Sequence, residues 1–379
     1  MMVKQCILTG VDLTDENDSK AHVIPSVLGG RLKPKGILSA KANGIFNDKF
    51  DYPLIREIYP FMALLGGARD RGENTPIKMS DREGNPYRVV FGKPLELAAP
   101  IFEEEEKPEG KEYRIHARTT EEARTLLGRV KKAHPGFDIE KALEEAVMQE
   151  SYVNGPLHGR GNIGPNVFFP ATFVMASVFA SHHGMAIHPD FKAYVDSFEP
   201  VPKLDELDGK QVDVKFPPDT FYWEHSNRWF TVPAEVSHVL CLYGDPHRKQ
   251  AIFYAEIFNL PGIAVVLPYA GEAPKLCTYG VDVVEGKEVE VKVDEAFLRA
   301  VSWKESHEKG SSGLMKIIEM KLGSLLKVAQ LRGQNHAIGE ILDKELGPLD
   351  GRVLSAEDVG KVSRTVAEFL ARQIVYSNS

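Results

Sequence analysis

The stretch AHVIPSVLGGRLKPKGILSAKANGIFN, from Ala21 to Asn47, decides how the start of the chain is interpreted. AHVIP is a short apolar run that stops at Pro25, which is typical of a strand end. A loop rich in glycine and bases then leads into a run with helical spacing. With a further strand predicted in KQCILTG upstream, the first sixty residues are predicted to form strand, loop, strand, loop and helix.

This stretch also holds the residue types that phosphodiester cleavage requires. Histidine can deprotonate water near neutral pH, and His22 lies on the second predicted strand. Oxygen ligands suit Mg²⁺ or Mn²⁺, and Asn43 and Asn47 share one face of the predicted helix. The alternatives are a structural histidine, a helix cap or turn at Asn43, and a plain polar residue at Asn47.

The charge pattern limits any contact with nucleic acid to a local patch. The chain has a net charge of −8, whereas a protein that coats nucleic acid should be basic. The thirty residues from Lys20 to Lys49 nevertheless carry a net charge of +5, with Arg31, Lys33, Lys35 and Lys41 among the bases. A solvated loop is the alternative interpretation of this basic patch.

The order and spacing of these segments resemble the HNH endonucleases, which have a ββα-metal fold. Many members contain CxxC, then acid-His-Ile-Ile-Pro, a Leu-Gly-Gly loop, Ile-Leu and CxxCN, with a Phe shortly after. The counterparts here are CILT (Cys6–Thr9), AHVIP (Ala21–Pro25), LGGRLKPKGIL (Leu28–Leu38) and SAKANGIF (Ser39–Phe46).

The resemblance covers about the first sixty residues and implies a role for each matching position. His22 would be the general base, and Asn43 and Asn47 would be ligands of a single Mg²⁺ or Mn²⁺ ion. The phosphate-binding residues would be Arg31, Lys33, Lys35 and Lys41. The family also suggests a role in bacterial or phage defence or in mobile-element biology.

Three departures from the family pattern matter. The acid before the histidine is replaced by Ala21, although Asp18 or Asp51 could substitute. Gly36 stands where an asparagine often braces the loop. Of the four zinc ligands only Cys6 remains, with Thr9, Ser39 and Ala42 in the other places. A structural zinc needs about four nitrogen or sulfur ligands, so none is expected. Packing should hold the domain instead, through Ile7, Leu8, Val23, Ile24, Ile37, Leu38 and Phe46.

Three scattered cysteines, with no CxxC pair, suit a reducing compartment, and the N-terminus has no signal-peptide pattern. A cytoplasmic protein is therefore expected. The most apolar run, Val167–Ser181, is too short to span a bilayer and predicts a buried helix, so no membrane partner is expected.

The expected fold class is α+β: a small N-terminal ββα-metal, HNH-like domain, then a larger mixed α/β domain with C-terminal helices. The expected parts are a domain at 1–65, a connector and strand–helix–helix unit at 66–150, a domain with an antiparallel meander at 151–310, and helices at 311–379. The C-terminal region would sense, regulate or select the target, and could bind a regulatory partner or a second copy.

The function expected from this sequence is divalent-metal-dependent cleavage of DNA. The alternative is an HNH-like module that has lost catalysis and binds nucleic acid or protein. A third possibility is a small-molecule site near the aromatic residues at 221–230.

Overall fold

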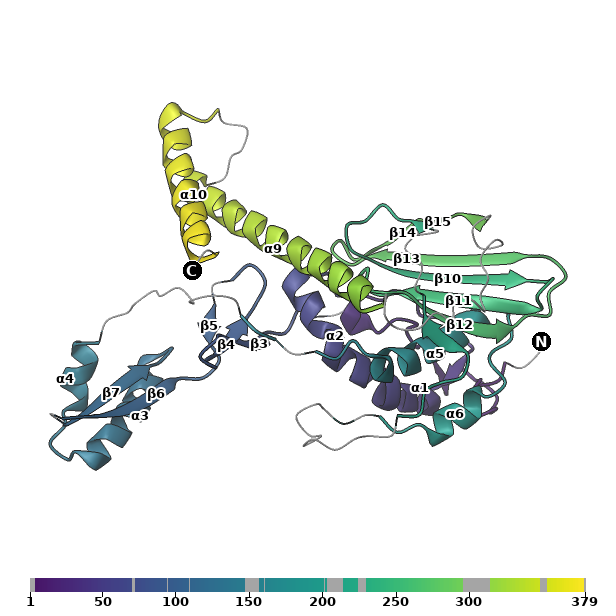
Figure 1. Ribbon diagram of the computed structural model, residues 1–379, viewed down its shortest axis with the longest axis horizontal. Helices are drawn as coiled ribbons and strands as arrows, with labels where there is room; N and C mark the ends of the chain where they lie inside the picture. The colour runs from purple at the N-terminus through teal and green to yellow at the C-terminus, as the bar shows by residue number, and fades with distance from the viewer. Residues whose placement is uncertain are drawn as a thin grey trace. The chain divides into compact units, whose positions relative to one another are not determined.

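The computed structural model describes residues 4–69, 72–93, 95–108, 110–146, 157–159, 161–200, 202, 214–223, 230–295, 314–347 and 353–377. The chain has mixed α+β structure and divides into two compact units (Figure 1). Unit 1 comprises residues 1–74 and 161–331, and unit 2 comprises residues 75–160 and 332–379.

An antiparallel six-stranded sheet forms one side of unit 1. Its strand order is β14-β13-β10-β11-β12-β8. The bounds are β8 Thr220–Tyr222, β10 Ser237–Asp245, β11 Gln250–Glu256, β12 Ile263–Pro268, β13 Lys275–Asp282 and β14 Lys287–Val289. The predicted meander is confirmed, and its turn GDPH joins β10 to β11. Short strands β9 (Phe230–Thr231) and β15 (Lys292–Val293) pair with each other.

Both faces of the central strand β10 are buried. Leu240 and Leu242 face the main core, whereas Val239, Cys241 and Tyr243 belong to a second apolar cluster. This division follows from the alternation of side chains along a strand. A sheet covered on both faces reads as an almost continuous apolar run, as VSHVLCLYG does.

Helices α5 (Pro165–His182) and α6 (Phe191–Ser197) pack on the main-core side of the sheet, together with the N-terminal helices (Figure 1). Nearly every residue of α5 from Val167 to Ala180 is buried, so the predicted buried helix is confirmed. No helix in the described part of the chain is long and apolar enough to cross a membrane.

The N-terminal segment forms a minimal hairpin followed by a long helix. Strand β1 (Asp18–Ser19) pairs antiparallel with β2 (Leu38–Ser39), and the 3₁₀ turn η1 (Ser26–Leu28) lies between them. Helix α1 (Ala40–Phe46) continues through the π-helical segment η2 (Asn47–Asp51) into α2 (Tyr52–Leu65). Ser39 caps the helix, because its side chain accepts a hydrogen bond from the Ala42 N–H.

The prediction of strands in KQCILTG and AHVIP is wrong. The first segment forms turns, in which the Gly10 N–H donates to the Cys6 carbonyl. In the second segment, the Val23 N–H donates to the Leu32 carbonyl, but the described residues form no continuous strand ladder there. The hairpin is instead made by Asp18–Ser19, in a segment too polar to be recognised as a strand.

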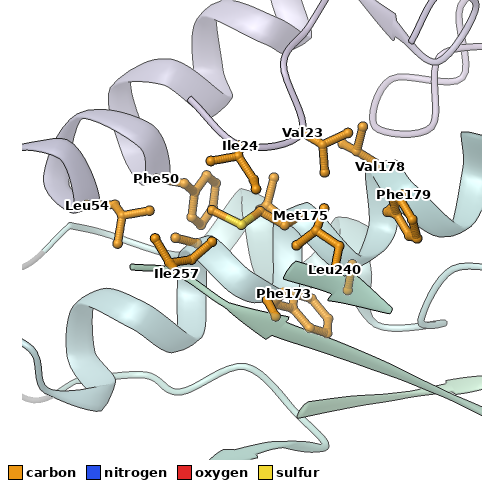
Figure 2. Close-up of a cluster of buried hydrophobic side chains, with 14 of the residues drawn as sticks. Val23, Ile24, Phe50, Leu54, Phe173, Met175, Val178, Phe179, Leu240 and Ile257 are labelled. Carbon is orange, nitrogen blue, oxygen red and sulfur yellow. The ribbon is translucent and has the colours of Figure 1, made fainter. Parts of the chain in front are cut away.

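The two compact units differ from the division of the chain expected from the sequence. The expected N-terminal core residues are buried, with Ile7 partly so, but they share one core with α5 and the sheet. In Figure 2, Val23 and Ile24 lie with Phe50, Leu54 and Met175. Residues 1–65 are therefore part of a larger unit, because their apolar face is completed by residues after 161.

Helix α9 (Leu314–Leu346) begins in unit 1, where a buried ion pair holds it. The Lys321 ammonium lies 2.8 Å from the Glu256 carboxylate, which has 0% exposed surface, and also donates to the Leu260 carbonyl. The Tyr254 hydroxyl donates to the same carboxylate oxygen at 3.0 Å. Lys321 therefore neutralises a carboxylate that water does not reach.

Replacing Lys321 by methionine is expected to lower the free energy of unfolding by about 3–5 kcal/mol, because the buried Glu256 carboxylate loses the ammonium that it contacts. Denaturant unfolding measures this loss. The double variant Lys321→Met/Glu256→Gln should recover much of it. A loss below about 1 kcal/mol in the single variant, typical of an exposed pair, would contradict the assignment.

Unit 2 contains a three-stranded sheet of β3 (Ile77–Ser80), β4 (Pro86–Val89) and β5 (Glu96–Leu97), and a hairpin of β6 (Ile101–Lys107) and β7 (Gly110–His116). Its helices are α3 (Thr120–Ala133), α4 (Ile139–Glu144) and α10 (Ala356–Ser377), with the end of α9. The capping box predicted at Thr119 is confirmed at its N-cap, since the Thr119 side chain accepts from the Glu122 N–H at 3.2 Å.

Candidate functional site

His22 lies in the extended segment between β1 and η1. Its side chain is half-buried, between the buried residues Ala21 and Val23. Ala21 is 4% exposed and belongs to the core, so an apolar residue fills the position where the family pattern has an acid. The nearby Asp18 carboxylate accepts from the Gly36 N–H at 2.9 and 3.1 Å and thereby holds the loop before β2.

The predicted ligands Asn43 and Asn47 lie on the same continuous helix. Asn43 is half-buried in α1, and Asn47 is exposed at the start of η2. The Asn47 amide nitrogen donates to Asp48, which leaves its amide oxygen uncommitted among the described contacts. The helix widens here, because the Tyr52 N–H donates to the Asn47 carbonyl five residues earlier. Such π-helical segments often occur at functional sites.

Asp51 ends this π-helical segment and carries a carboxyl group with unusual surroundings. Burial raises the pKa of Asp51 to about 7. Among the described contacts, no hydrogen bond or salt bridge offsets this loss of water. A desolvated carboxyl without a partner is a candidate functional group.

Two side chains of the sheet hold the loop that follows His22. His238 on β10 has no exposed surface, and its Nε2 lies 2.6 Å from the Leu28 carbonyl. Its Nδ1 accepts from the Phe258 N–H at 3.1 Å, so Nε2 carries the proton and donates to Leu28. The Tyr279 hydroxyl accepts from the N–H groups of Arg31 and Leu32, each at 3.0 Å.

Burial lowers the pKa of His238 to about 4, although its hydrogen bond to Leu28 acts in the opposite direction. The ring is therefore neutral at physiological pH. Gly30 is required in the same loop, because a Cβ there would lie 1.9 Å from the Ile24 carbonyl oxygen. No local pattern pointed to His238 or Tyr279, which are more than 200 residues away from the loop they hold.

The basic residues expected to bind phosphate differ in their exposure and in the contacts that they already make. Arg31 donates to the carbonyls of Ala68 and Arg69, each at 3.2 Å, so its guanidinium holds the chain after α2. Lys33 is half-buried, whereas Lys35 and Lys41 are exposed. Lys4, which the sequence did not suggest, is exposed and lies against Gly36. The exposed bases of this patch are thus Lys4, Lys35 and Lys41, with Lys20.

The four positions that hold zinc in the family pattern lie together. Burial raises the pKa of Cys6, but the neighbouring backbone and side-chain groups of Ser39 and Thr9 outweigh it, so the pKa is lowered overall. The Ala42 N–H in turn donates to the Ser39 side chain at 3.3 Å. The Ile7 N–H donates to the Ile37 carbonyl at 3.0 Å, so a backbone hydrogen bond connects the two segments that a zinc ion would otherwise join.

The oxygen donors on this helix suit a hard divalent cation better than a soft one. The described residues contain no group of three or more histidine, cysteine, aspartate or glutamate side chains that could hold a metal. Asparagine oxygens and one carboxylate on the helix remain, and Mg²⁺ usually binds few protein ligands and keeps several waters. The donor set therefore fits Mg²⁺ or Mn²⁺.

No protein-family model, curated protein or solved structure matches the chain. Of the other histidines, His182 and His183 end α5 as predicted, and His188 donates to Asp219 at 3.1 Å. Residues 224–229, within the aromatic region considered for a small-molecule site, lie outside the described residues.

Proposed function

We propose that the N-terminal segment is a divergent HNH-type, ββα-metal element that cleaves DNA with the help of one divalent metal ion. The observation that carries this proposal is that Ser39 and Thr9 lie near enough to the Cys6 thiol to lower its pKa, with Ala42 bonded to Ser39. Cys6 and Ser39 lie 33 residues apart in the sequence, and the resemblance requires that they come together.

The roles follow from the chemistry of the side chains. His22 removes a proton from the attacking water, for which a half-buried imidazole is suited. Asn43 and Asn47 offer amide oxygens to Mg²⁺ or Mn²⁺, which when bound stabilises charge on the scissile phosphate. Lys35 and Lys41, with Lys33 beside them, bind flanking phosphates, whereas Arg31 acts mainly on the fold of the loop.

Plasmid DNA cleavage with Mg²⁺, Mn²⁺ or EDTA tests this function. His22→Ala is expected to lower the cleavage rate by about 10²–10⁴-fold, the usual contribution of a general base, without loss of folding. His182→Ala, which removes an exposed histidine at the end of α5, should cleave as the parent does. Cleavage by His22→Ala at the parental rate would exclude the assignment.

A second candidate function is binding of nucleic acid without cleavage. It is favoured by the buried Ala21, which cannot bind a metal, and by the use of Asp18 to hold Gly36. DNA binding with no cleavage in Mg²⁺ or Mn²⁺ would support it. The salt dependence of that binding should then correspond to a few phosphate contacts.

A further inference from the structure

The site described above lacks the carboxylate that a divalent cation usually receives from the protein. Ala21 is in the core, and both oxygens of Asp18 lie within hydrogen-bonding distance of the Gly36 N–H. Asp48 is exposed and already accepts from Asn47. The helical segment from Ala40 to Leu65 carries two other acids, Asp51 and Glu57. Glu57 is bonded to Arg56 and Asn162, so Asp51 is the carboxylate that remains.

The π-helical segment turns Asp51 toward the face that carries the asparagines. Eight residues of a regular α-helix overshoot whole turns by about 80°. The residue accommodated in the wider turn at Asn47–Asp51 brings Asp51 back to within about 20° of the direction of Asn43. The widened turn therefore keeps Asn43, Asn47 and Asp51 in one row along the helix.

Two contacts bracket His22 along this helix. Asp18 pairs with Ser39, the residue that caps the helix. Six residues later, Ile24 packs in the cluster that contains Phe50 and Leu54 (Figure 2). The segment that contains His22 therefore runs beside the helix between Ser39 and Leu54.

Asp51 and Asn47 are the oxygen donors of this row that can share one ion. They are one turn apart, with about 6 Å between their Cβ atoms. Asn43 and Asp51 are two turns apart, about 11–12 Å along the axis, which is too far for both to bind the same ion directly. An ion held by Asp51 therefore takes its amide ligand from Asn47 and not from Asn43.

We propose that Asp51, together with the amide oxygen of Asn47, binds the divalent cation and replaces the acid that is absent at Ala21. This inference rests on the proposed function, since it names a ligand for the same ion. It also explains why a half-buried carboxyl is kept without a partner among the described contacts: the cation would supply the missing counter-charge.

Titration of the full-length protein with Mn²⁺ at pH 8, with free Mn²⁺ followed by electron paramagnetic resonance, tests the ligand directly. Asp51→Asn is expected to weaken Mn²⁺ binding by about 10–100-fold or more, since even changes behind the ligands cost that much. Asp48→Asn is the matched control, because it removes the same charge from the same helix, and it should bind as the parent does. Asp18→Asn tests the competing carboxylate.

Thermal unfolding supplies a second readout and a check of folding. Asp51→Asn removes a buried carboxyl, so in EDTA it is expected to melt no lower than the parent. Saturating Mn²⁺ should raise the melting temperature of the parent and of Asp48→Asn, but not that of Asp51→Asn.

The outcomes separate the ligand from the function. If Asp51→Asn binds Mn²⁺ as the parent does, or if Asp18→Asn alone loses binding, the inference is overturned. The endonuclease proposal would survive that result if the parent still cleaved DNA and His22→Ala did not. A parent that binds no Mn²⁺ and cleaves no DNA would overturn both.

Discussion

Replacing Thr9, Ser39 and Ala42 together by cysteine is expected to create a tetrahedral zinc site with Cys6. Ser39 and Thr9 already lie near enough to the Cys6 thiol to lower its pKa, and Ala42 lies one turn from the helix cap. Without metal, loss of the Ser39 cap should cost about 1 kcal/mol. Zinc at 1,000 times its dissociation constant should then raise the free energy of unfolding by about 4 kcal/mol.

Denaturant unfolding with zinc or with EDTA measures this effect, and the cobalt(II) spectrum reports tetrahedral thiolate coordination. The matched control carries the same three cysteines and Cys6→Ser, which leaves three thiolates and should bind zinc much more weakly. If the four-cysteine variant gains no stability from zinc, the four positions do not have the geometry of an HNH zinc site. This test of the resemblance requires no catalytic activity.

Replacing His238 by alanine is expected to lower the free energy of unfolding by about 3–5 kcal/mol, because it opens a cavity and leaves the Leu28 carbonyl and the Phe258 N–H buried without their partner. Denaturant unfolding at pH 8 measures the loss. His182→Ala, at an exposed position, should change stability by less than about 0.5 kcal/mol. A comparable value for the two variants would exclude His238 as the support of the loop.

The same residue predicts how stability depends on pH. The pKa of His238 is about 4 in the folded protein against an ordinary 6.5, so below pH 6.5 the unfolded chain binds a proton that the folded chain does not. The stabilisation is complete above pH 6.5 and is lost as the pH falls to about 4, by up to about 3 kcal/mol. His238→Gln, which cannot titrate, should lose correspondingly less stability over that range.

Local patterns in the sequence predicted the parts of the fold that depend on neighbouring residues. The cap at Thr119, the buried helix α5 and the turn between β10 and β11 each have their signal within a few residues. The N-terminal hairpin was misplaced, because Asp18 and Ser19 are polar and AHVIP has the apolar pattern of a strand. Apolar pattern alone does not reveal which backbone groups pair.

For the candidate site, too, the sequence predicted some residues but not the properties that depend on packing. His22, Asn43 and Asn47 were chosen from spacing, and their roles remain predictions. Asp51 could be suggested from sequence, but its burial and its lack of a partner depend on packing against distant residues. The use of Arg31 to hold Ala68 and Arg69 could not be foreseen, since an arginine in a basic loop equally suggests phosphate binding.

The division of unit 1 into two stretches of sequence has a consequence during synthesis. Residues 1–74 complete their core only with residues 161–331, so about 250 further residues must be translated before the unit can close. At about 5–20 residues per second, the N-terminal helices wait for roughly ten to fifty seconds with their apolar face uncovered. The nascent chain is therefore expected to depend on chaperones until β13 and α9 emerge from the ribosome, and to acquire any activity only after residue 331 has been translated.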